Sequence, residues 1–246
     1  MAEKSVKDIV VKVIPAKIAV PFVKAHHYSG KVVQNSCLHF GAFLDGVLHG
    51  VMSYGPSMDK TKTIGLVEGT RWNEFLELNR MAFDEALPRN SESRCIGISL
   101  RLIRKNAPHI KWVISFADGC QCGDGTIYRA SNFVLTGIKK NDTIRVDPET
   151  GKPIASLSVQ AHDPNRARTI ATWKKLEGFQ LRYIYFLDPA ARERLTVPII
   201  PFSAIDEYGA GMYQGKKITR EERRNGAQRS ESNRHDPTVA GHPTLE

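Results

Sequence analysis

The stretch that most constrains how this chain can fold is residues 111–133. It begins with a β-branched and aromatic segment, passes into a turn dense in glycine, and leads to a segment in which Ile127, Ala130 and Val134 keep helical spacing. The pattern predicts a strand, a loop and a helix. Because ligands in open α/β sheets collect beyond the carboxyl ends of strands, Asp118, which ends the predicted strand, is placed where chemistry would occur.

Tyr128 is the second candidate side chain of this stretch. It follows Asp118 by ten residues, near the start of the predicted helix, so both side chains can face one crevice. In the alternative interpretation, Asp118 only caps the turn and Tyr128 is a core aromatic. Taken alone, the stretch favours this structural alternative.

Length and composition indicate one main domain. With 246 residues, 41% of them hydrophobic, the chain can bury one sizeable core. We expect residues 1–215 to form this domain. The sequence has no apolar run of about 18 residues, which excludes a membrane-spanning helix, and no hydrophobic signal region at its start.

The cysteines favour a cytoplasmic protein. Four cysteines are too few and too irregularly spaced for the disulfide framework of a secreted domain. Cys120 and Cys122 are separated by one residue, whereas zinc ribbons separate paired cysteines by two or more, and no second Cys/His pair follows at that spacing. We therefore do not expect a structural zinc site in this loop.

The charge of the chain indicates a polyanionic partner. The formal net charge is +9 and the isoelectric point is about 9.4. Residues 216–234 hold seven Lys or Arg against three Glu, with few apolar residues. We expect residues 216–246 to be a flexible basic tail, with order fading after Gly215, that adds salt-dependent affinity for phosphates. The alternative is a solvated terminus without a partner.

The first predicted elements are a strand over residues 6–14 and a helix over residues 17–26. Pro21 is tolerated if it lies in the first turn, where amides lack intrahelical partners. The helix ends in His26-His27-Tyr28-Ser29-Gly30, where the glycine can adopt the left-handed conformation. His27 and Tyr28 are candidate ligands or bases, although paired histidines are more often ordinary surface residues.

A hairpin and a strand come next. Residues 36–44 and 47–54 are predicted strands joined by Asp45-Gly46, a strong hairpin signal. Residues 57–71 are expected to be a polar, mobile loop that offers its basic residues to phosphates. Residues 74–83 form the next predicted strand, on which alternation puts four side chains on one face: Leu76, Leu78, Arg80 and Ala82. Arg80 then needs an anionic partner, more commonly a protein carboxylate than a ligand.

A helix starting at residues 90–93 should present an anion site. The hydroxyls of Ser91 and Ser93, together with the free amides of the first turn, suit a cofactor phosphate, although both serines are also ordinary capping residues. The helix should end near Asn106. The remaining elements are a strand over 133–140, a hairpin over 143–159, a helix over 164–176 and a strand over 180–187.

This order of elements resembles the GNAT acyltransferase fold. The resemblance implies an α/β (α+β) architecture with a central mixed, mostly antiparallel sheet and flanking helices. Ordinary members cradle the pyrophosphate of acetyl-CoA in a glycine-rich loop before the central helix. Residues 87–94 occupy that place here without such a loop, which argues against acetyl-CoA and leaves the donor of any transferred group unidentified.

A more specific resemblance covers roughly residues 26–137. Its motifs are His27-Tyr28-Ser29, Leu38-His39-Phe40-Gly41-Ala42-Phe43, Gly50-Val51 with Ser53-Tyr54-Gly55, Glu77-Leu78-Asn79-Arg80-Met81, Ser115-Phe116-Ala117-Asp118 and Ile127-Tyr128-Arg129-Ala130-Ser131-Asn132. In this order they resemble the bacteriophage Mom family, a divergent GNAT-like group. The Cys120-Gln-Cys122 loop, which bears histidine in many members, and residues 143–178, which we interpret as an insertion, lie outside the pattern.

The Mom resemblance implies a DNA-modifying transferase. Members add a carbamoylmethyl (acetamido) group to N6 of adenine in phage DNA, which shields the genome from host restriction, and iron is implicated as cofactor. The positions carried over as functional are His27, Tyr28, Arg80, Asp118 and Tyr128. Our hypothesis is that His27, Asp118 and Tyr28 hold Fe²⁺, Tyr128 orients donor or base, and Arg80 pairs with an anionic group.

The implied partner is double-stranded DNA, whose target base must leave the stack before N6 can react. Basic loops and the tail would contact phosphates, and aromatic side chains would hold the base. Two other functions stay open: a conventional N-acetyltransferase of a small molecule or protein, and a non-catalytic DNA-binding module. A homodimer also stays open.

Overall fold

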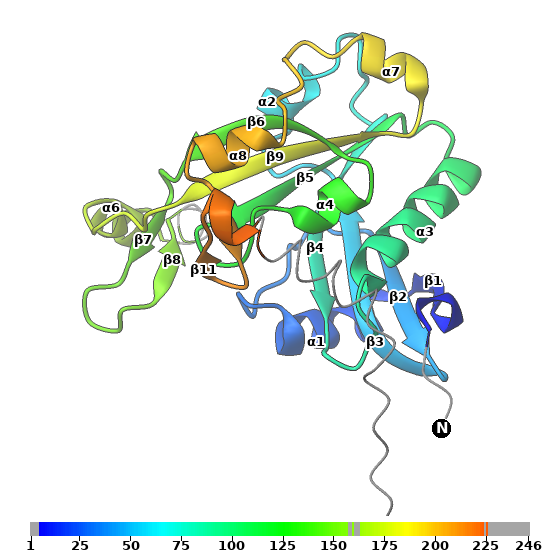
Figure 1. Cartoon of the computed structure of the whole chain (residues 1–246), viewed down its shortest axis with the longest axis horizontal. Helices are drawn as coiled ribbons and strands as arrows, with labels where there is room; N and C mark the ends of the chain where they lie inside the picture. The colour runs from blue at the N-terminus through cyan, green and yellow to red at the C-terminus, as the bar shows by residue number, and fades with distance from the viewer. Residues whose placement is uncertain (1–4, 157–158, 160–162, 224, 226–246) are drawn as a thin grey trace, which may run out of the picture.

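A seven-stranded sheet organises the computed structural model, which describes residues 5–156, 159, 163–223 and 225 (Figure 1). In spatial order its strands are β1 (Val10–Ile14), β2 (Leu38–Leu44), β3 (Val47–Gly55), β4 (Phe75–Phe83), β5 (Trp112–Gly119), β9 (Phe179–Phe186) and β6 (Val134–Lys140). All neighbours are antiparallel except β4 and β5. The predicted mixed, mostly antiparallel sheet is confirmed.

Helices cover both faces of this sheet. Helix α1 (Ala16–His26) packs on one face against β2, β3 and β4. Helix α3 (Ser91–Asn106), which connects β4 to β5 in the sequence, covers the other face, and α4 (Thr126–Ala130) packs beside it. Apart from the short α2 (Lys60–Ile64) between β3 and β4, the order from β1 to β6 is strand, helix, hairpin, strand, helix, strand, helix, strand. This is the order predicted for a GNAT-like fold, and that fold class is confirmed.

The hydrophobic pattern explains why α3 is the central helix. Ile96, Leu100 and Ile103, at helical spacing, are each at most 2% exposed and pack against the sheet in the largest apolar cluster. A second cluster on the opposite face joins α1 to the sheet through Val23 and Ala82. The hairpin between β2 and β3 turns where predicted, with Asp45 at φ 52° and Gly46 at φ 80°.

Helix α1 differs from its prediction around Pro21. The helix begins at Ala16, so Pro21 lies in its second turn, where it removes a donor to the carbonyl of Lys17. The amide of His27 caps the end by donating to Val23 O. Gly30 does adopt φ +60°, but it closes a separate turn after the helix.

Residues 57–71 are more ordered than predicted. They include α2 (Lys60–Ile64), and Leu66 and Val67 are buried in a third apolar cluster with Trp112. The prediction followed the many polar residues of the segment, but the buried Leu66 and Val67 are enough to anchor it. Helix α4 is also shorter than its pattern indicated, since Val134 already begins β6.

Residues 143–178 lie between β6 and β9 and stay outside the main sheet. Strands β7 (Ile144–Val146) and β8 (Pro153–Ala155) form a sheet of their own, followed by α6 (Pro164–Ala171), which is shorter than predicted. Asp163 caps α6 by accepting from the amide of Arg166. The helix therefore begins where predicted, and only its length differs from the prediction.

The chain stays ordered beyond Gly215, contrary to prediction. After α7 (Pro189–Glu193) and α8 (Ser203–Glu207) come β10 (Met212–Tyr213) and β11 (Lys216–Lys217), and contacts continue to Arg223. Residues 226–246, the rest of the predicted tail, lie outside the described residues. Within the described part of the chain, no helix is both long and apolar enough to cross a bilayer.

Candidate active site

The site begins where β4 and β5 separate. These parallel strands pair at Phe75↔Trp112, Leu76↔Val113 and Glu77↔Ile114 only; beyond this point β4 pairs with β3, and β5 pairs with β9. Figure 1 shows the two strands spreading apart toward their carboxyl ends. Ser115 Oγ donates to Leu78 O at 2.9 Å just past the last pair. Side chains that follow on either strand therefore lie near the point at which the two strands separate, which is called the opening below.

A β-bulge at Asn79 turns Arg80 to the α1 face. Ser53 pairs with Arg80 and Tyr54 with Leu78, so Asn79 is the extra residue. Leu78 then belongs to the α3-side cluster, whereas Ala82 packs with α1. The prediction that Leu76, Leu78, Arg80 and Ala82 share one face is wrong, because the bulge reverses the alternation between Leu78 and Arg80.

Tyr28 and Asp118, ninety residues apart, meet at this opening. The phenol of Tyr28 donates to Asp118 Oδ2 at 3.1 Å. The same carboxylate accepts from the Cys120 amide at 3.0 Å and from Gln121 Nε2 at 2.8 Å. Asp118 thus caps the turn, as the structural interpretation expected, and also accepts from Tyr28. Its functional role stays a prediction.

The pKa values of Tyr28 and His27 are shifted away from neutrality. Partial burial and the neighbouring Asp118 carboxylate raise the pKa of the Tyr28 phenol. Burial and then the positive charge of Arg80 lower the pKa of His27 to about 4. At neutral pH the site therefore presents a protonated phenol and an uncharged imidazole. Their rings lie 4.3 Å apart between centroids.

Arg80 has no carboxylate within ion-pair distance among the residues that the structure describes. Its Nε donates to Lys31 O at 3.0 Å and its Nη1 to Asn79 O at 2.6 Å. The structural carboxylate that the prediction favoured is therefore not found at ion-pair distance among the described residues. Desolvation lowers the pKa of this guanidinium, and its remaining donors are available to an anionic ligand.

Two buried polar residues beside Arg80 were not predicted as site residues. Glu77 is 8% exposed, and burial raises the pKa of its carboxyl, which accepts from the Met58 amide at 3.1 Å. Asn79 accepts from Ser36 Oγ at 2.8 Å, while its Nδ2 has no partner within the described chain. Both stand in the motif Glu77-Leu78-Asn79-Arg80-Met81, which was the available signal.

Tyr128 is a core aromatic whose hydroxyl belongs to the same electrostatic environment. The residue is 7% exposed, and its ring lies 5.4 Å from Phe133 and 5.2 Å from Tyr183 between centroids. Burial raises its pKa to about 12, with Ser115 opposing part of the rise. The charges of Glu77 and Arg80 also act on it. Tyr128 therefore serves the core and is a hydrogen-bond donor near the opening.

Ser91 and Ser93 are not brought into contact with these residues. Ser91 is 1% exposed and its hydroxyl donates to Pro88 O. Ser93 Oγ donates to Asn90 O at 3.2 Å. Both hydroxyls are thus used locally at the start of α3, and their predicted cofactor contact stays a prediction.

The predicted iron ligands do not form a metal site as they stand. Within the described residues there is no group of three His, Cys, Asp or Glu side chains that could hold a metal ion. His27 Nδ1 accepts from the Ser29 amide at 3.1 Å and lies 2.8 Å from Ser29 Oγ. Tyr28, the third predicted ligand, would bind iron through its phenol oxygen, which here donates to Asp118. The predicted iron site therefore stays a prediction.

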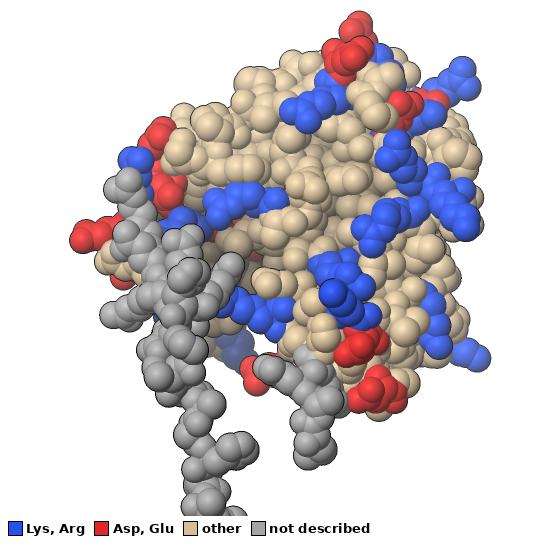
Figure 2. All heavy atoms as spheres, turned by 45° about the vertical axis from the view of Figure 1, so that its right-hand side comes forward, with Lys and Arg blue, Asp and Glu red and all other residues tan. Residues whose placement is uncertain are grey.

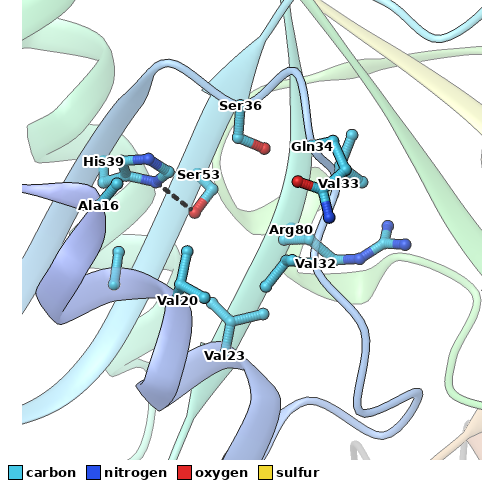
Figure 3. Close-up of a pocket in the computed structure, with 11 residues that line it drawn as sticks. Ala16, Val20, Val23, Val32, Val33, Gln34, Ser36, His39, Ser53 and Arg80 are labelled. Atoms are coloured by element: carbon cyan, nitrogen blue, oxygen red, sulfur yellow. Dashed lines mark hydrogen bonds between the residues drawn. The ribbon is translucent and has the colours of Figure 1, made fainter.

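A cavity of about 180 Å³ lies on the α1 side of Arg80 (Figure 3). His39, Ser53 and Arg80 are cross-strand neighbours on β2, β3 and β4, and His39 Nδ1 lies 2.8 Å from Ser53 Oγ. Burial lowers the pKa of His39, so this polar row is uncharged except at Arg80. In Figure 3 the guanidinium of Arg80 points away from His39 and Ser53, so only its stem lines the cavity.

Basic side chains are spread over the face shown in Figure 2, while acidic ones gather mainly toward its edges. The middle of this face therefore carries more basic than acidic side chains, in keeping with the formal net charge of +9. Such a surface favours the approach of a polyanion. The charge favours this approach but does not identify which side chains contact the polyanion.

Comparison with known sequences identifies one family. The Mom protein family model matches residues 8–204. The methylcarbamoylase mom of Escherichia phage Mu is 34% identical over 197 residues, which cover 78% of this chain and 81% of that protein.

Solved structures with a related arrangement are acetyltransferases. A GNAT family acetyltransferase from Elizabethkingia anophelis, with acetyl-CoA bound, is 13% identical, covers 73% of this chain and 98% of its own, and has a TM-score of 0.43. A polyamine N-acetyltransferase of Drosophila melanogaster is 10% identical, covers 73% of this chain and 100% of its own, and has a TM-score of 0.44.

Proposed function

The chain belongs to the Mom protein family, and on that premise we propose that it is a phage DNA-modifying transferase that adds a carbamoylmethyl group to N6 of adenine. The matched relative is a methylcarbamoylase and shares 34% of its residues over most of both chains. The modification would protect phage DNA from host restriction, in the cytoplasm of the host. The substrate is double-stranded DNA.

The observation that carries this proposal is the contact between Tyr28 and Asp118. A half-exposed phenol, 53% accessible, donates at 3.1 Å to a carboxylate at the end of β5. Arg80 lies close enough to influence the pKa of that phenol and has no carboxylate within ion-pair distance among the described residues. An aromatic face, a proton acceptor and a free cation are the groups that a transfer to an extruded base requires.

Adenine N6 is a weak nucleophile because its lone pair is delocalised into the ring. In the proposed reaction, the base leaves the duplex at a cost of a few kcal/mol. Its N6 attacks the methylene carbon of a carbamoylmethyl donor, the bond from that carbon to the leaving group breaks, and the N6 proton passes to Asp118. General-base catalysis of this kind contributes roughly 10²- to 10⁴-fold.

The other residues support this step. Tyr28 stacks on the extruded base and orients the Asp118 carboxylate through its hydroxyl. His27, uncharged because its pKa is about 4, packs against Tyr28 and positions it. Arg80 binds an anionic group of the donor or of the DNA. Tyr128, with its pKa near 12, stays protonated and donates a hydrogen bond to the donor.

Mass spectrometry of nucleosides from cells expressing the chain tests the proposal. The parent should yield a new adenosine derivative carrying the carbamoylmethyl mass. Asp118→Asn should reduce that product at least about 100-fold, and Tyr28→Phe, which keeps the ring but loses the hydroxyl, should reduce it less. Unmodified adenosine with saturable acetyl-CoA binding would instead indicate an acetyltransferase. DNA binding without any product would indicate a non-catalytic module.

Iron dependence is a separate part of the proposal, supported by the family resemblance and not by the donor set. Metal analysis of anaerobically purified protein tests it with His27→Ala and Asp118→Ala beside the parent. Iron in the parent and its loss in both variants would support these ligands. Equal iron in all three would remove them from the metal site.

A further inference from the structure

The hairpin of β10 and β11 lies beyond the family match, which ends at residue 204. Met212 pairs with Lys217, and Tyr213 pairs with Lys216. The turn uses Gln214 at φ 47° and Gly215 at φ 75°, both in the left-handed region that a tight hairpin turn requires. The hairpin is therefore a defined element and not an extended terminus.

Backbone hydrogen bonds join this hairpin to the loop that follows Asp118. Gly215 N donates to Cys122 O at 2.7 Å, and Asp124 N donates to Met212 O at 3.0 Å. Cys122 N in turn donates to Asp118 O at 3.0 Å. The tip of the hairpin is thus two hydrogen bonds away from the backbone of the proposed proton acceptor.

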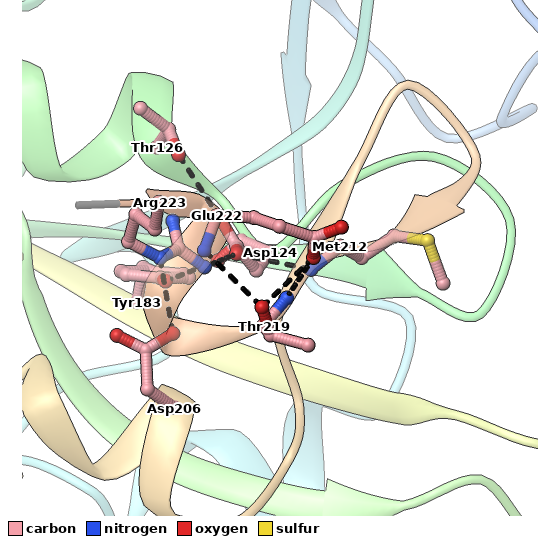
Figure 4. A network of polar contacts seen from close by, with 8 residues as sticks. All are labelled: Asp124, Thr126, Tyr183, Asp206, Met212, Thr219, Glu222 and Arg223. Carbon is pink, nitrogen blue, oxygen red and sulfur yellow. Dashed lines mark hydrogen bonds and ion pairs between the residues drawn. The ribbon is translucent and has the colours of Figure 1, made fainter. Parts of the chain in front are cut away.

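Arg223 holds the hairpin in this position (Figure 4). Its guanidinium pairs with Asp124, which is 2% exposed, and its Nε donates to Asp206 Oδ1 at 3.0 Å. The Asp124 carboxylate also accepts from the Met212 amide at 3.1 Å and from Thr126 Oγ1 at 3.1 Å. Every oxygen of this buried carboxylate is satisfied, so the hairpin has a fixed anchor.

The outer face of the hairpin is aromatic and basic. Tyr213 and Lys216 are directly opposite and therefore share a face. Tyr213 is 55% exposed and Lys216 is exposed on this face. Lys217 is opposite the buried Met212 and so lies on the other face, but it too is exposed. An exposed aromatic ring beside lysines suits a nucleic-acid strand, since the ring stacks on a base and the lysines contact phosphates.

The charge near the hairpin agrees with such a partner. Residues 216–225 hold five Lys or Arg against two Glu, and one of the five, Arg223, is already paired with Asp124 and Asp206. Residues 226–246 hold two Arg against three acidic residues. The positive charge assigned to the whole tail is therefore concentrated next to the hairpin. An acidic peptide would use the lysines but would leave the Tyr213 ring without a stacking partner.

We propose that the β10–β11 hairpin binds the DNA strand beside the target adenine. Lys216 and Lys217 contact phosphates, and Tyr213 stacks on an exposed base. The proposal rests on DNA being the substrate. It adds a binding surface outside the part of the chain that the family shares, and it locates that surface beside the Asp118 loop.

Binding of the full chain to a duplex of mixed sequence, without any donor, tests the lysines. Affinity is measured by fluorescence anisotropy over a series of KCl concentrations. Lys216→Ala with Lys217→Ala should weaken binding and make the slope of log K against log salt shallower by about 2. The matched control is Arg104→Ala with Lys105→Ala, an adjacent exposed basic pair at the far end of α3. Its salt slope should equal that of the parent.

Tyr213 is tested on single-stranded and duplex DNA. Tyr213→Leu should bind single strands roughly 5- to 100-fold more weakly, while Tyr213→Phe should bind like the parent. All variants change exposed side chains, so their thermal unfolding should match the parent. Equal salt slopes for the Lys216/Lys217 variant and the Arg104/Lys105 control, together with parent-like binding by Tyr213→Leu, would overturn the proposal.

These outcomes are separable from failure of the proposed function. If the hairpin variants lose DNA affinity while the parent forms no modified adenosine, the hairpin proposal holds and the adenine chemistry fails. If the parent modifies adenine and the hairpin variants bind DNA as the control pair does, the chemistry holds and the hairpin proposal fails.

Discussion

At the scale of single residues, burial controls the protonation of the site. His27 and Tyr28 directly follow α1. Burial lowers the pKa of the imidazole and raises the pKa of the phenol, so neither group is ionised near neutral pH. Tyr28 can donate to Asp118 only while its phenol is protonated. The site therefore works with a neutral pair of rings beside one carboxylate and one guanidinium.

The lowered pKa of His27 predicts a stability change at acid pH. The unfolded chain binds a proton at this histidine near pH 6.5, whereas the folded protein binds it only near pH 4. The unfolded state is therefore favoured as pH falls from about 6.5 to 4, by up to about 2–3 kcal/mol. His27→Gln should lose less stability over this range. Urea unfolding of both proteins at several pH values measures the difference, and parallel profiles would contradict it.

At the scale of elements, the loop from Asp118 to Gly125 is held by its own turn and by Met212 and Arg223, which lie far along the chain. Its own turn is closed by the Asp118 carboxylate and carbonyl. Its far side is held by Met212 and Arg223 through the buried Asp124. Gly125, at φ +87°, has no room for a side chain because an added Cβ would lie 2.5 Å from the Tyr183 ring. The loop is thus a rigid support for Asp118.

Loss of Arg223 should be far more costly than loss of an exposed ion pair. Arg223→Gln leaves the Asp124 carboxylate buried without its cation, which should lower the free energy of unfolding by about 2–4 kcal/mol. Lys175→Gln removes a pair with Asp142 in which both side chains are more than half exposed, and should cost under about 1 kcal/mol. Urea unfolding compares the two, and similar losses would show that Asp124 does not depend on Arg223.

At the scale of the whole molecule, the positive charge lies on the folded part of the chain. Figure 2 shows basic side chains over one face, and the charge of residues 226–246 is slightly acidic. Attraction of a polyanion should therefore depend on the described residues. The terminal segment adds length without adding net positive charge.

Truncation tests this distribution. A chain ending at Asn225 keeps Arg223 and the hairpin, so its unfolding free energy should change by less than about 0.5 kcal/mol and its DNA affinity should stay within about threefold of the parent. A chain ending at Gly211 loses both Met212 and Arg223 and should be markedly less stable. Thermal unfolding and anisotropy measure both chains. A large loss of DNA affinity on truncation at Asn225 would assign the contacts to Arg229 and Arg234 instead.

Local patterns were sufficient where one short segment decides the outcome. Asp45-Gly46 specified the hairpin, the spacing of Ile96, Leu100 and Ile103 specified α3, and Asp163-Pro164 specified the start of α6. The motifs around His27, Arg80 and Asp118 also indicated the family, which the family match confirms. Each of these signals depends on residues within a few positions of one another.

Other features could not be predicted because they depend on partners far along the chain. The bulge at Asn79 appears only when β4 pairs with β3, and it moves Arg80 to the other face. Leu66 and Val67 are buried in a cluster with Trp112, which lies more than forty positions later in the sequence. Arg223 is paired with Asp124, which lies 99 residues earlier.

The sequence by itself determined the main strands and helices around the sheet, their order and the chemically capable residues, because local backbone preference and hydrophobic spacing act over a few residues. Only the tertiary structure decided that the Tyr28 phenol meets the Asp118 carboxylate, that Arg80 has no protein carboxylate at ion-pair distance within the described chain, and that the C-terminal hairpin reaches the same loop. Such contacts depend on how the strands pair and where they separate, and no local pattern encodes that geometry.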